Sequence, residues 1–554
     1  MLNGLKKDPK SMTGILLAAL MAITVLVYLR GLTGQFVWDD RLFFLDNDIL
    51  PSWRPWDIDK ILLEPSTYWR DHIPATNFLF TLEYNIFGRF TPGYHAVSLL
   101  LYIVTGVFVY KLTCLLYVFA NQTGRFASQS GRDWGENTSA LLVTSFFMLH
   151  PVHVEVVSYI TGQKDLLYGL FSVITLYAIS VYSSGRVSGR AGSLWLMVAA
   201  ISYYLAFLSK AMAVATALFL PVFWFFVLRK KGDGLVRPFL FWIALNIPAF
   251  GWVIYSLSKY LDLIAIVSGL SDRLVLGTKV LGAHVSVFLL PWPLNFGYPF
   301  YTTGVFDNNM FLGIFILITT AAMAALRPRS FVTLGLLCFL IFLLPVLQVF
   351  VRIQNAMIFD RYLYLSVLGG ALVVERILAT ASRYLRPGAP VAAAMGICLL
   401  FAGLTAAYVP KFQSDLASLE HAYRTFPGWD RPAFDYEYAL IEAGKLDEAE
   451  GLARRERTFD RPQWVRPYFL GWIMLERGRP YDALGYLELA SYDTMMGGYF
   501  PFPDLPLGRA YMMLGKEGNA RAAFKRVMDR QIQNPLEFYK AKVALDSMNS
   551  EKPD

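Results

Sequence analysis

A succession of long apolar segments constrains the fold of this chain more than any other feature. An α-helix needs about 20 consecutive apolar residues to cross a bilayer. Because backbone polar groups inside a bilayer must be hydrogen-bonded within the segment, such segments are expected to be helical. The sequence therefore predicts an all-α, polytopic membrane helix bundle of about eleven transmembrane helices. They are expected near 11–29, 94–120, 139–150, 166–182, 193–208, 211–228, 239–257, 309–326, 331–350, 362–380 and 391–409.

The composition agrees with a membrane protein. Of the 554 residues, 55% are hydrophobic and only 17% are charged, whereas soluble proteins carry about 25% charged residues. The net charge of +8 arises from short basic clusters between the apolar segments, so it indicates membrane lipid and no nucleic-acid partner. Cys114, Cys338 and Cys398 all lie in apolar segments, which favours neither a disulfide framework nor a zinc site.

The basic clusters predict an orientation in the membrane. They occupy the N-terminus, with Lys6, Lys7 and Lys10, and five loops near 125–132, 186–190, 229–231, 327–329 and 383–386. The positive-inside rule makes these loops cytoplasmic, provided that 274–290 forms a re-entrant or interfacial helix. The other loops, and the chain after 408, are then expected on the outer side. No small-x-small cleavage site follows the first segment, so we expect a retained anchor.

The composition changes near Lys411, where charged, helically periodic sequence begins. Three similar phrases start at Ala443, Arg477 and Leu514, and each places Gly in a short link with Ala five residues later. The first two Gly residues are 34 positions apart and the next two are 37 apart. This spacing is typical of tetratricopeptide repeats, although an ordinary helical hairpin domain is the alternative. We predict a membrane domain over 1–409 and a tetratricopeptide-repeat α-solenoid over 410–554.

An acidic pair, Asp39 and Asp40, follows the first apolar segment directly. Two adjacent carboxylates at a membrane surface repel each other and lose hydration, which indicates a function. We interpret the pair as the source of a catalytic general base, with Asp40 slightly favoured. The alternative is a solvated loop in which an Asp caps a helix.

A second motif fills a tight outer turn between two segments. His150, His153 and Glu155 are followed by Lys164 and Asp165. Two His and a Glu could ligate a divalent metal. However, Pro151 disfavours helical geometry at His150, so a hydrogen-bonded structural turn remains an alternative to a site for metal or substrate.

Basic residues also occur at the outer surface, at Arg70, Lys210, Arg352 and Arg361. Because the Arg guanidinium matches phosphate oxygens in a bidentate fork, these residues are candidates for binding a lipid phosphate. The alternative is that their side chains only snorkel to the membrane interface. There is no Gly-rich phosphate loop, so a soluble nucleotide-sugar or ATP site is not supported.

In combination, these motifs resemble the transmembrane and tetratricopeptide-repeat O-mannosyltransferase family, which consists of multi-span glycosyltransferases of the GT-C superfamily, and its bacterial relatives. The similar segments are 36–40, 149–155 with 162–166, 208–210, 291–299 and 360–365, and the repeats follow. The family's Arg-Pro pair is replaced here by the separated Arg70 and Pro74.

The resemblance implies a GT-C-like fold and a polyprenyl-phosphate sugar as donor substrate, carrying mannose or another hexose. A carboxylate of the outer loop would activate a hydroxyl of a protein or glycan acceptor, and the anomeric carbon would be inverted. The repeats would bind the protein or peptide acceptor. For a bacterial member, it implies an inner-membrane protein whose active site and repeats face the periplasm. Two rival functions remain, namely a non-enzymatic assembly platform and a lipid-linked oligosaccharide polymerase, ligase or transporter.

Overall fold

The computed structural model describes residues 9–67, 72–123, 135–185, 187–229, 234, 236–258, 269–298, 307–349, 358–386, 388–427, 430–455, 464–496, 503–529 and 535–550. Within these residues the secondary structure is helical, apart from one isolated β-bridge between Tyr298 and Ile358. The chain forms two compact units. The first contains 1–35, 73–79 and 90–413, and the second contains 36–72, 80–89 and 414–554.

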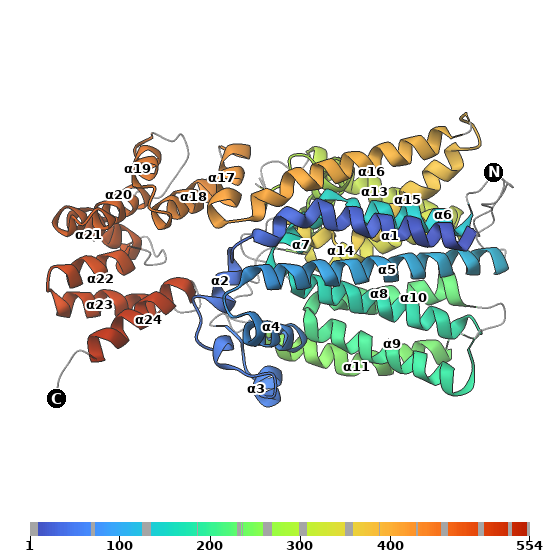
Figure 1. Ribbon diagram of the computed structural model, residues 1–554, viewed down its shortest axis with the longest axis horizontal. Helices are drawn as coiled ribbons and strands as arrows, with labels where there is room; N and C mark the ends of the chain where they lie inside the picture. Colours follow the sequence, from blue (N-terminus) through green and yellow to red (C-terminus); the bar gives the residue numbers. More distant parts are fainter. Residues whose placement is uncertain are drawn as a thin grey trace, which may run out of the picture. The chain divides into compact units, whose positions relative to one another are not determined.

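The first unit is a bundle of long apolar helices (Figure 1). Its hydrophobic core is continuous and contains aromatic side chains such as Tyr102, Phe147, Phe339 and Tyr364. The helices are α1 (Pro9–Tyr28), α5 (Thr91–Thr123), α6 (Glu136–Leu149), α7 (Val154–Ser158), α8 (Gln163–Ser183), α9 (Gly189–Ser209), α10 (Val214–Phe223), α11 (Val236–Ser258), α12 (Leu270–Leu289), α13 (Asn308–Leu326), α14 (Phe331–Leu343), α15 (Ser366–Ala381) and α16 (Ala389–Tyr408).

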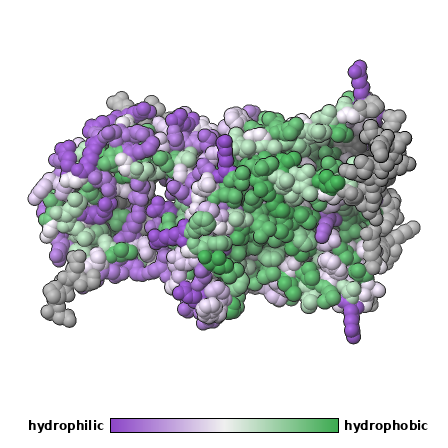
Figure 2. Space-filling view, in the orientation of Figure 1, coloured by the Kyte–Doolittle hydropathy of each residue, from purple (hydrophilic) through white to green (hydrophobic). Residues whose placement is uncertain are grey.

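This unit has the properties of an integral membrane protein. Hydrophobic residues cover most of its visible surface (Figure 2). Among the described residues, seven helices are long and apolar enough to cross a membrane, and the bent pair α6–α7 would make an eighth. This count is lower than the eleven expected. All eleven predicted segments contain helix, but the apolar parts of α11 and α14 are short and α15 carries the buried Glu375.

Close helix crossings in this unit depend on glycine. A Cβ atom on Gly335 of α14 would lie 2.6 Å from the backbone oxygen of Gly369 in α15, and one on Gly369 would lie 2.4 Å from that of Gly335. Similarly, Gly313 of α13 lies against Thr278 of α12. Small residues let backbones approach closely, as is common between membrane helices.

The second unit combines the first loop with the C-terminal helices. The loop part contains α2 (Asp39–Phe44), α3 (Ile58–Leu63) and the second half of α4 (Pro74–Phe87). The C-terminal part contains α17 (Asp415–Thr425), α18 (Asp430–Glu442), α19 (Leu446–Arg454), α20 (Val465–Glu476), α21 (Pro480–Met496), α22 (Asp504–Met513), α23 (Glu517–Met528) and α24 (Pro535–Ser550).

The predicted repeat phrases form helical hairpins. Gly444, Gly478 and Gly515 link the two helices of each pair with φ angles of 73°, 73° and 69°. Each makes the same C-cap, in which the Gly N–H and the next N–H donate to carbonyls three and five residues back. This is a Schellman motif, which favours Gly because of its positive φ. Ala449, Ala483 and Ala520 are fully buried, as the spacing predicts. The tetratricopeptide identity of the hairpins stays a prediction.

The predicted division into 1–409 and 410–554 stays a prediction. In the structure, the compact unit that holds the helices from Ser414 onward also contains 36–72 and 80–89. Polar contacts join this loop to the C-terminal helices, from Trp38 to Asp415 and Ser418 of α17 and from Asp48 to Lys542 of α24. Aromatic contacts among Phe36, Phe43, Phe44 and Phe80 hold the loop segments to one another.

Candidate functional site

A cluster of charged residues lies at one end of the membrane unit. Four structural elements contribute residues to it, and each of them is a short helix, a helix end or a turn at this end of the bundle. Glu155 lies on the short α7, and Lys164 and Asp165 lie in the first turn of α8. Lys210 has extended backbone angles (φ −162°, ψ 138°) between α9 and the next 3-10 turn. Arg361 lies in the 3-10 turn Asp360–Leu363, just before α15.

Arg361 forms a salt bridge with the buried Glu155. Its guanidinium NH1 group donates to Glu155 Oε1, and its backbone N–H donates to Oε2 at 2.9 Å. The carboxylate is completely buried, whereas 14% of the Arg361 side chain stays exposed. Arg361 also lies over the Phe359 ring, at 3.9 Å from its centroid. These contacts fix the Arg361 guanidinium at the surface of the cluster. Part of it stays accessible to an anion.

Lys210 forms a second pair of the same kind. Its Nζ donates to Asp165 Oδ1 at 2.5 Å, with 15% of the lysine side chain exposed and the carboxylate buried. Burial is the main cause that lowers the pKa of Lys210 to about 8; Asp165 opposes this shift, and the positive charges of Lys164 and Arg361 add to it. The three cations are therefore close enough to repel one another, and an incoming anion would relieve this repulsion.

Asp360 and Tyr298 extend the cluster, and the sequence did not identify either as a site residue. The Tyr298 hydroxyl donates to Asp360 Oδ1 at 2.7 Å. Burial and the negative charge of Glu155 raise the pKa of Asp360 well above its usual range. The signals were present in the sequence, since Asp360 adjoins Arg361 and Tyr298 lies in one of the segments that carry the family resemblance.

The two histidines of the turn between α6 and α8 act as structural links. His150 has extended backbone angles (φ −66°, ψ 126°) before Pro151, as the sequence predicts. Its Nε2 lies 3.1 Å from Phe288 O, and its Nδ1 accepts from Val152 N–H. His153 bridges the Tyr102 hydroxyl, at 2.8 Å, and Tyr364 O, at 3.1 Å.

This arrangement does not fit a metal at the turn. Both nitrogens of each imidazole have protein partners, and Arg361 occupies both oxygens of Glu155. Among the residues that the structure describes, no group of three His, Cys, Asp or Glu side chains could hold a metal ion.

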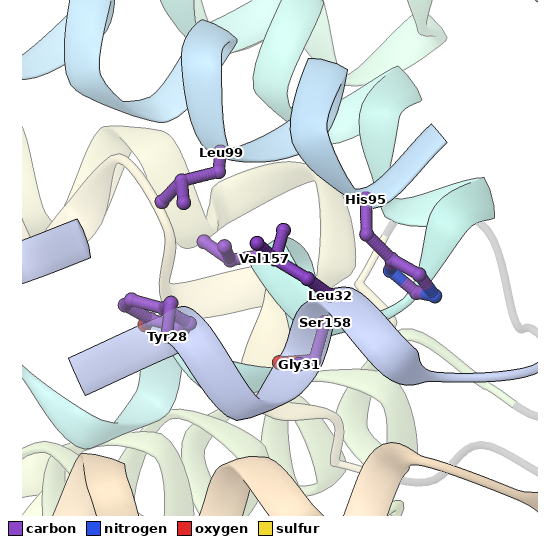
Figure 3. A pocket seen from close by; sticks show the side chains of 7 residues that line it. All are labelled: Tyr28, Gly31, Leu32, His95, Leu99, Val157 and Ser158. Atoms are coloured by element: carbon purple, nitrogen blue, oxygen red, sulfur yellow. The ribbon is translucent and has the colours of Figure 1, made fainter. Parts of the chain in front are cut away.

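A small cavity lies behind the turn, between the end of α1, α5 and α7. Its volume is about 10 Å³, and it is lined by Tyr28, Gly31, Leu32, His95, Leu99, Val157 and Ser158 (Figure 3). This space is about that of one water molecule, so the cavity is too small for a sugar. The buried Ser158 hydroxyl, which has no partner within the described ranges, would suit such a water.

The acidic pair lies in the second unit, at the start of α2. Asp40 is fully buried, and its Oδ2 accepts from Val37 N–H at 3.1 Å. Asp39 is half-buried. Asp40 thus has a structural bond within the loop and is the more deeply buried residue of the pair.

The residue before the pair has a rare backbone conformation. Trp38 has φ 55° and ψ −121°, the angles of the first central residue of a type II′ turn, where glycine is preferred. Asp40 N–H closes this turn by donating to Val37 O at 2.9 Å. Holding a non-glycine residue there costs about 1–3 kcal/mol, and such strain often occurs at functional sites.

The remaining predicted cations, Arg70 and Arg352, lie outside the described residues. Of the predicted site residues that are described, the structure brings together Glu155, Lys164, Asp165, Lys210 and Arg361. His150 and His153 support the same turn from within the core.

The fold and this cluster define a polytopic membrane protein with a polar site at one end of its bundle, and comparisons with known proteins agree. No protein-family model matches the chain. It is 25% identical over 218 residues to protein O-mannosyl-transferase TMTC4 of Homo sapiens, covering 38% of this chain and 29% of the relative. It is 28% identical over 166 residues to protein O-mannosyl-transferase F38B6.6 of Caenorhabditis elegans, covering 29% and 22%. These matches confirm the resemblance to O-mannosyltransferases.

The matched segments span less than a third of the relatives' own lengths. Among solved structures, the Archaeoglobus fulgidus oligosaccharyltransferase in its apo form matches with a TM-score of 0.40 and 14% identity, covering 72% of this chain and 56% of that one.

Proposed function

We propose that the chain is a membrane glycosyltransferase of GT-C type. It would move mannose or another hexose from a polyprenyl-phosphate donor to a hydroxyl group of a protein or glycan acceptor. The reaction would take place on the outer, periplasmic side of a bacterial inner membrane. The sequence similarity to protein O-mannosyl-transferases supports the reaction class.

The observation that carries the proposal is the cluster of Lys164, Lys210 and Arg361. Lys210 and Arg361 each lie against a fully buried carboxylate while their own side chains stay partly exposed. The buried carboxylates hold the cations in fixed positions before an anion arrives. Preorganised cations of this kind stabilise the charge that develops on a departing phosphate. Arg70 and Arg352 would complete the phosphate site, and the acceptor hydroxyl would come from a protein held by the repeats.

The proposed chemistry is a single displacement. A carboxylate of the acidic pair takes the proton of the acceptor hydroxyl, and the oxygen attacks the anomeric carbon. The bond between that carbon and the phosphate oxygen breaks, so the configuration inverts and the lipid phosphate leaves as an anion. We favour Asp39 over Asp40 as the base, because Asp40 is buried and its Oδ2 accepts from Val37 N–H. No step is assigned to a metal.

The test uses the purified chain in lipid with a panel of polyprenyl-phosphate hexoses, and it measures released lipid phosphate and glycosylated acceptor. Asp39→Asn should lower the transfer rate by about 10²–10⁴-fold, the usual loss on removing a general base. Donor binding should stay unchanged. If Asp39→Asn and the double variant with Asp40→Asn both transfer sugar at the parental rate, the mechanism is wrong.

The two rival functions make different predictions in the same assay. An assembly platform would release no lipid phosphate from any donor, and Lys210→Gln would leave its function intact. A polymerase or ligase would transfer only to a lipid-linked acceptor and would ignore peptides. The similarity to O-mannosyltransferases favours the transferase over both.

A further inference from the structure

The strained turn at Trp38 is held by α17, the first helix after the membrane bundle. The backbone N–H of Trp38 donates to Asp415 Oδ1 at 2.8 Å. Its indole Nε1–H donates to Ser418 Oγ, also at 2.8 Å. Asp415 and Ser418 lie one helical turn apart, so a single helix face holds both the backbone and the side chain of the same residue.

We propose that Asp415 and Ser418 are positioning residues that hold Trp38 in its turn and thereby aim Asp39 at the acceptor. This inference rests on the proposed function, because it assigns a purpose to the geometry of the proposed base. According to this inference, the C-terminal part of the chain orients Asp39. The membrane bundle, which carries the cationic cluster, does not.

The turn requires such a support for a steric reason. A tryptophan at positive φ brings its Cβ close to the backbone, so an unsupported loop would relax to a more common conformation. If Trp38 relaxed, the peptide that joins it to Asp39 would rotate, and the Asp39 carboxylate would point elsewhere. The two hydrogen bonds that Trp38 donates to α17 prevent this. The bond to Asp415 is the stronger kind, because its acceptor is ionised.

A further ionic network ties the same loop to the repeats. Arg41, two residues after Asp39, donates to Asp46 at 3.0 Å. It also lies 3.9 Å from Asp415 and 3.8 Å from Glu442, at the end of α18. The loop therefore contacts both α17 and the first hairpin. An acceptor protein that binds the repeats would meet a base held by the same group of helices.

Asp415 has an environment that suits this role. Its pKa is raised to about 6, mainly by burial and to a smaller extent by Glu442 and Asp46, while the Trp38 N–H and Arg41 oppose the shift. The carboxyl group is still mainly ionised at pH 7, as a strong acceptor for Trp38 N–H requires. As the pH falls through 6, protonation should weaken the bond.

The experiment compares variants of the full chain in lipid. Asp415→Ala and Ser418→Ala should each lower the rate constant of transfer by about 10- to 100-fold, as expected when a well-placed hydrogen bond is lost. The dissociation constant of the polyprenyl-phosphate donor should not change. Asp415→Asn keeps a carbonyl oxygen that can accept from Trp38 N–H, so it should retain much of the rate.

A matched control is Asp482→Ala. Asp482 is also an acidic residue in the first turn of a C-terminal helix, but its ion pair is with an exposed arginine, Arg479. Its replacement should leave the rate constant unchanged. Hydrogen–deuterium exchange of the peptide 36–44 gives a readout independent of activity, and exchange should rise in Asp415→Ala and Ser418→Ala but not in Asp482→Ala.

The outcomes separate this inference from the proposed function. If the parental chain transfers no sugar, the proposed function fails, but the exchange measurement still tests whether α17 holds the turn. If the parental chain is active and Ser418→Ala and Asp415→Ala match it in rate and in exchange, the inference is overturned. If Asp415→Ala fails to fold, Ser418→Ala decides the question by its rate constant and by the exchange of the peptide 36–44.

Discussion

Lys210 is subject to two opposing effects that together make it a suitable phosphate ligand. Burial disfavours its charged form, and Asp165 at 2.5 Å favours it. The balance leaves its pKa at about 8, below the ordinary lysine value of about 10.4. Lys210 therefore keeps its charge near pH 7 and loses it within the range in which the protein can be assayed.

This balance predicts a pH dependence of donor binding. Lys210 is charged below pH 8 and neutral above it, whereas a phosphodiester donor keeps its single charge throughout. From pH 7 to pH 9 the charged fraction of such a lysine falls about tenfold, so the donor dissociation constant should rise by up to about that factor. Bound phosphate would move the change to higher pH, because it favours the charged form. Equilibrium binding of a polyprenyl-phosphate hexose measures the effect.

Lys210→Arg provides the control, because arginine stays charged over this range. Its binding should be weaker than that of the parental chain at pH 7, since the guanidinium does not fit the lysine geometry. Its affinity should nevertheless vary little between pH 7 and pH 9. The same pH dependence in both proteins would show that another group titrates.

At the scale of elements, the crossing of α14 and α15 positions Arg361. Gly335 and Gly369 face each other with no room for a side chain, and α15 begins five residues after Arg361. A displacement of α15 would therefore move the 3-10 turn that carries Asp360 and Arg361.

Gly369→Ala should separate the two helices and destabilise the protein. The added methyl would lie 2.4 Å from Gly335 O and 2.5 Å from Phe339 N, and such overpacking typically costs about 1–3 kcal/mol. Thermal unfolding in detergent measures this loss, and donor affinity should fall with it. Gly403→Ala on α16 is the control, because nothing lies within 4 Å of its added Cβ. Equal stability of both variants would contradict the close crossing.

The sequence predicts elements better than contacts between distant elements. The repeat hairpins follow from Gly and Ala spacing, because a Schellman motif is a local structure. The apolar segments likewise predict helices, although α15 contains the buried ion pair of Glu375 and Arg376, which apolarity alone cannot reveal. The number of membrane crossings stays a prediction.

The contacts within the candidate site were only partly predictable. Glu155, Asp165, Lys210 and Arg361 were all identified from the sequence, but their pairing was not, because it joins residues 45 and 206 positions apart. The bond from Trp38 to Asp415 joins residues 377 positions apart. No local pattern predicts it, and the positive φ of Trp38 is unexpected because glycine is favoured there.

At the scale of the whole molecule, the orientation of the chain in the membrane determines on which side the charged cluster and the repeats are expected. The positive-inside rule places the loop after α15, with Arg383 and Arg386, in the cytoplasm. Because α15 separates Arg361 from that loop, the charged cluster is then expected on the outer side. The chain crosses back through α16, so the repeats are expected outside as well.

Cysteine labelling of intact cells tests this orientation. Cys114, Cys338 and Cys398 are first replaced by Ala or Ser, and Tyr384→Cys or Tyr481→Cys is then introduced. Tyr384 in the loop after α15 is 84% exposed, and Tyr481 on α21 is 79% exposed, so both positions are equally open to solvent. An impermeant maleimide added outside should label position 481 and not 384, and permeabilisation should make 384 reactive. Labelling of position 384 in intact cells would contradict the predicted orientation. It would also contradict a donor site on the outer face.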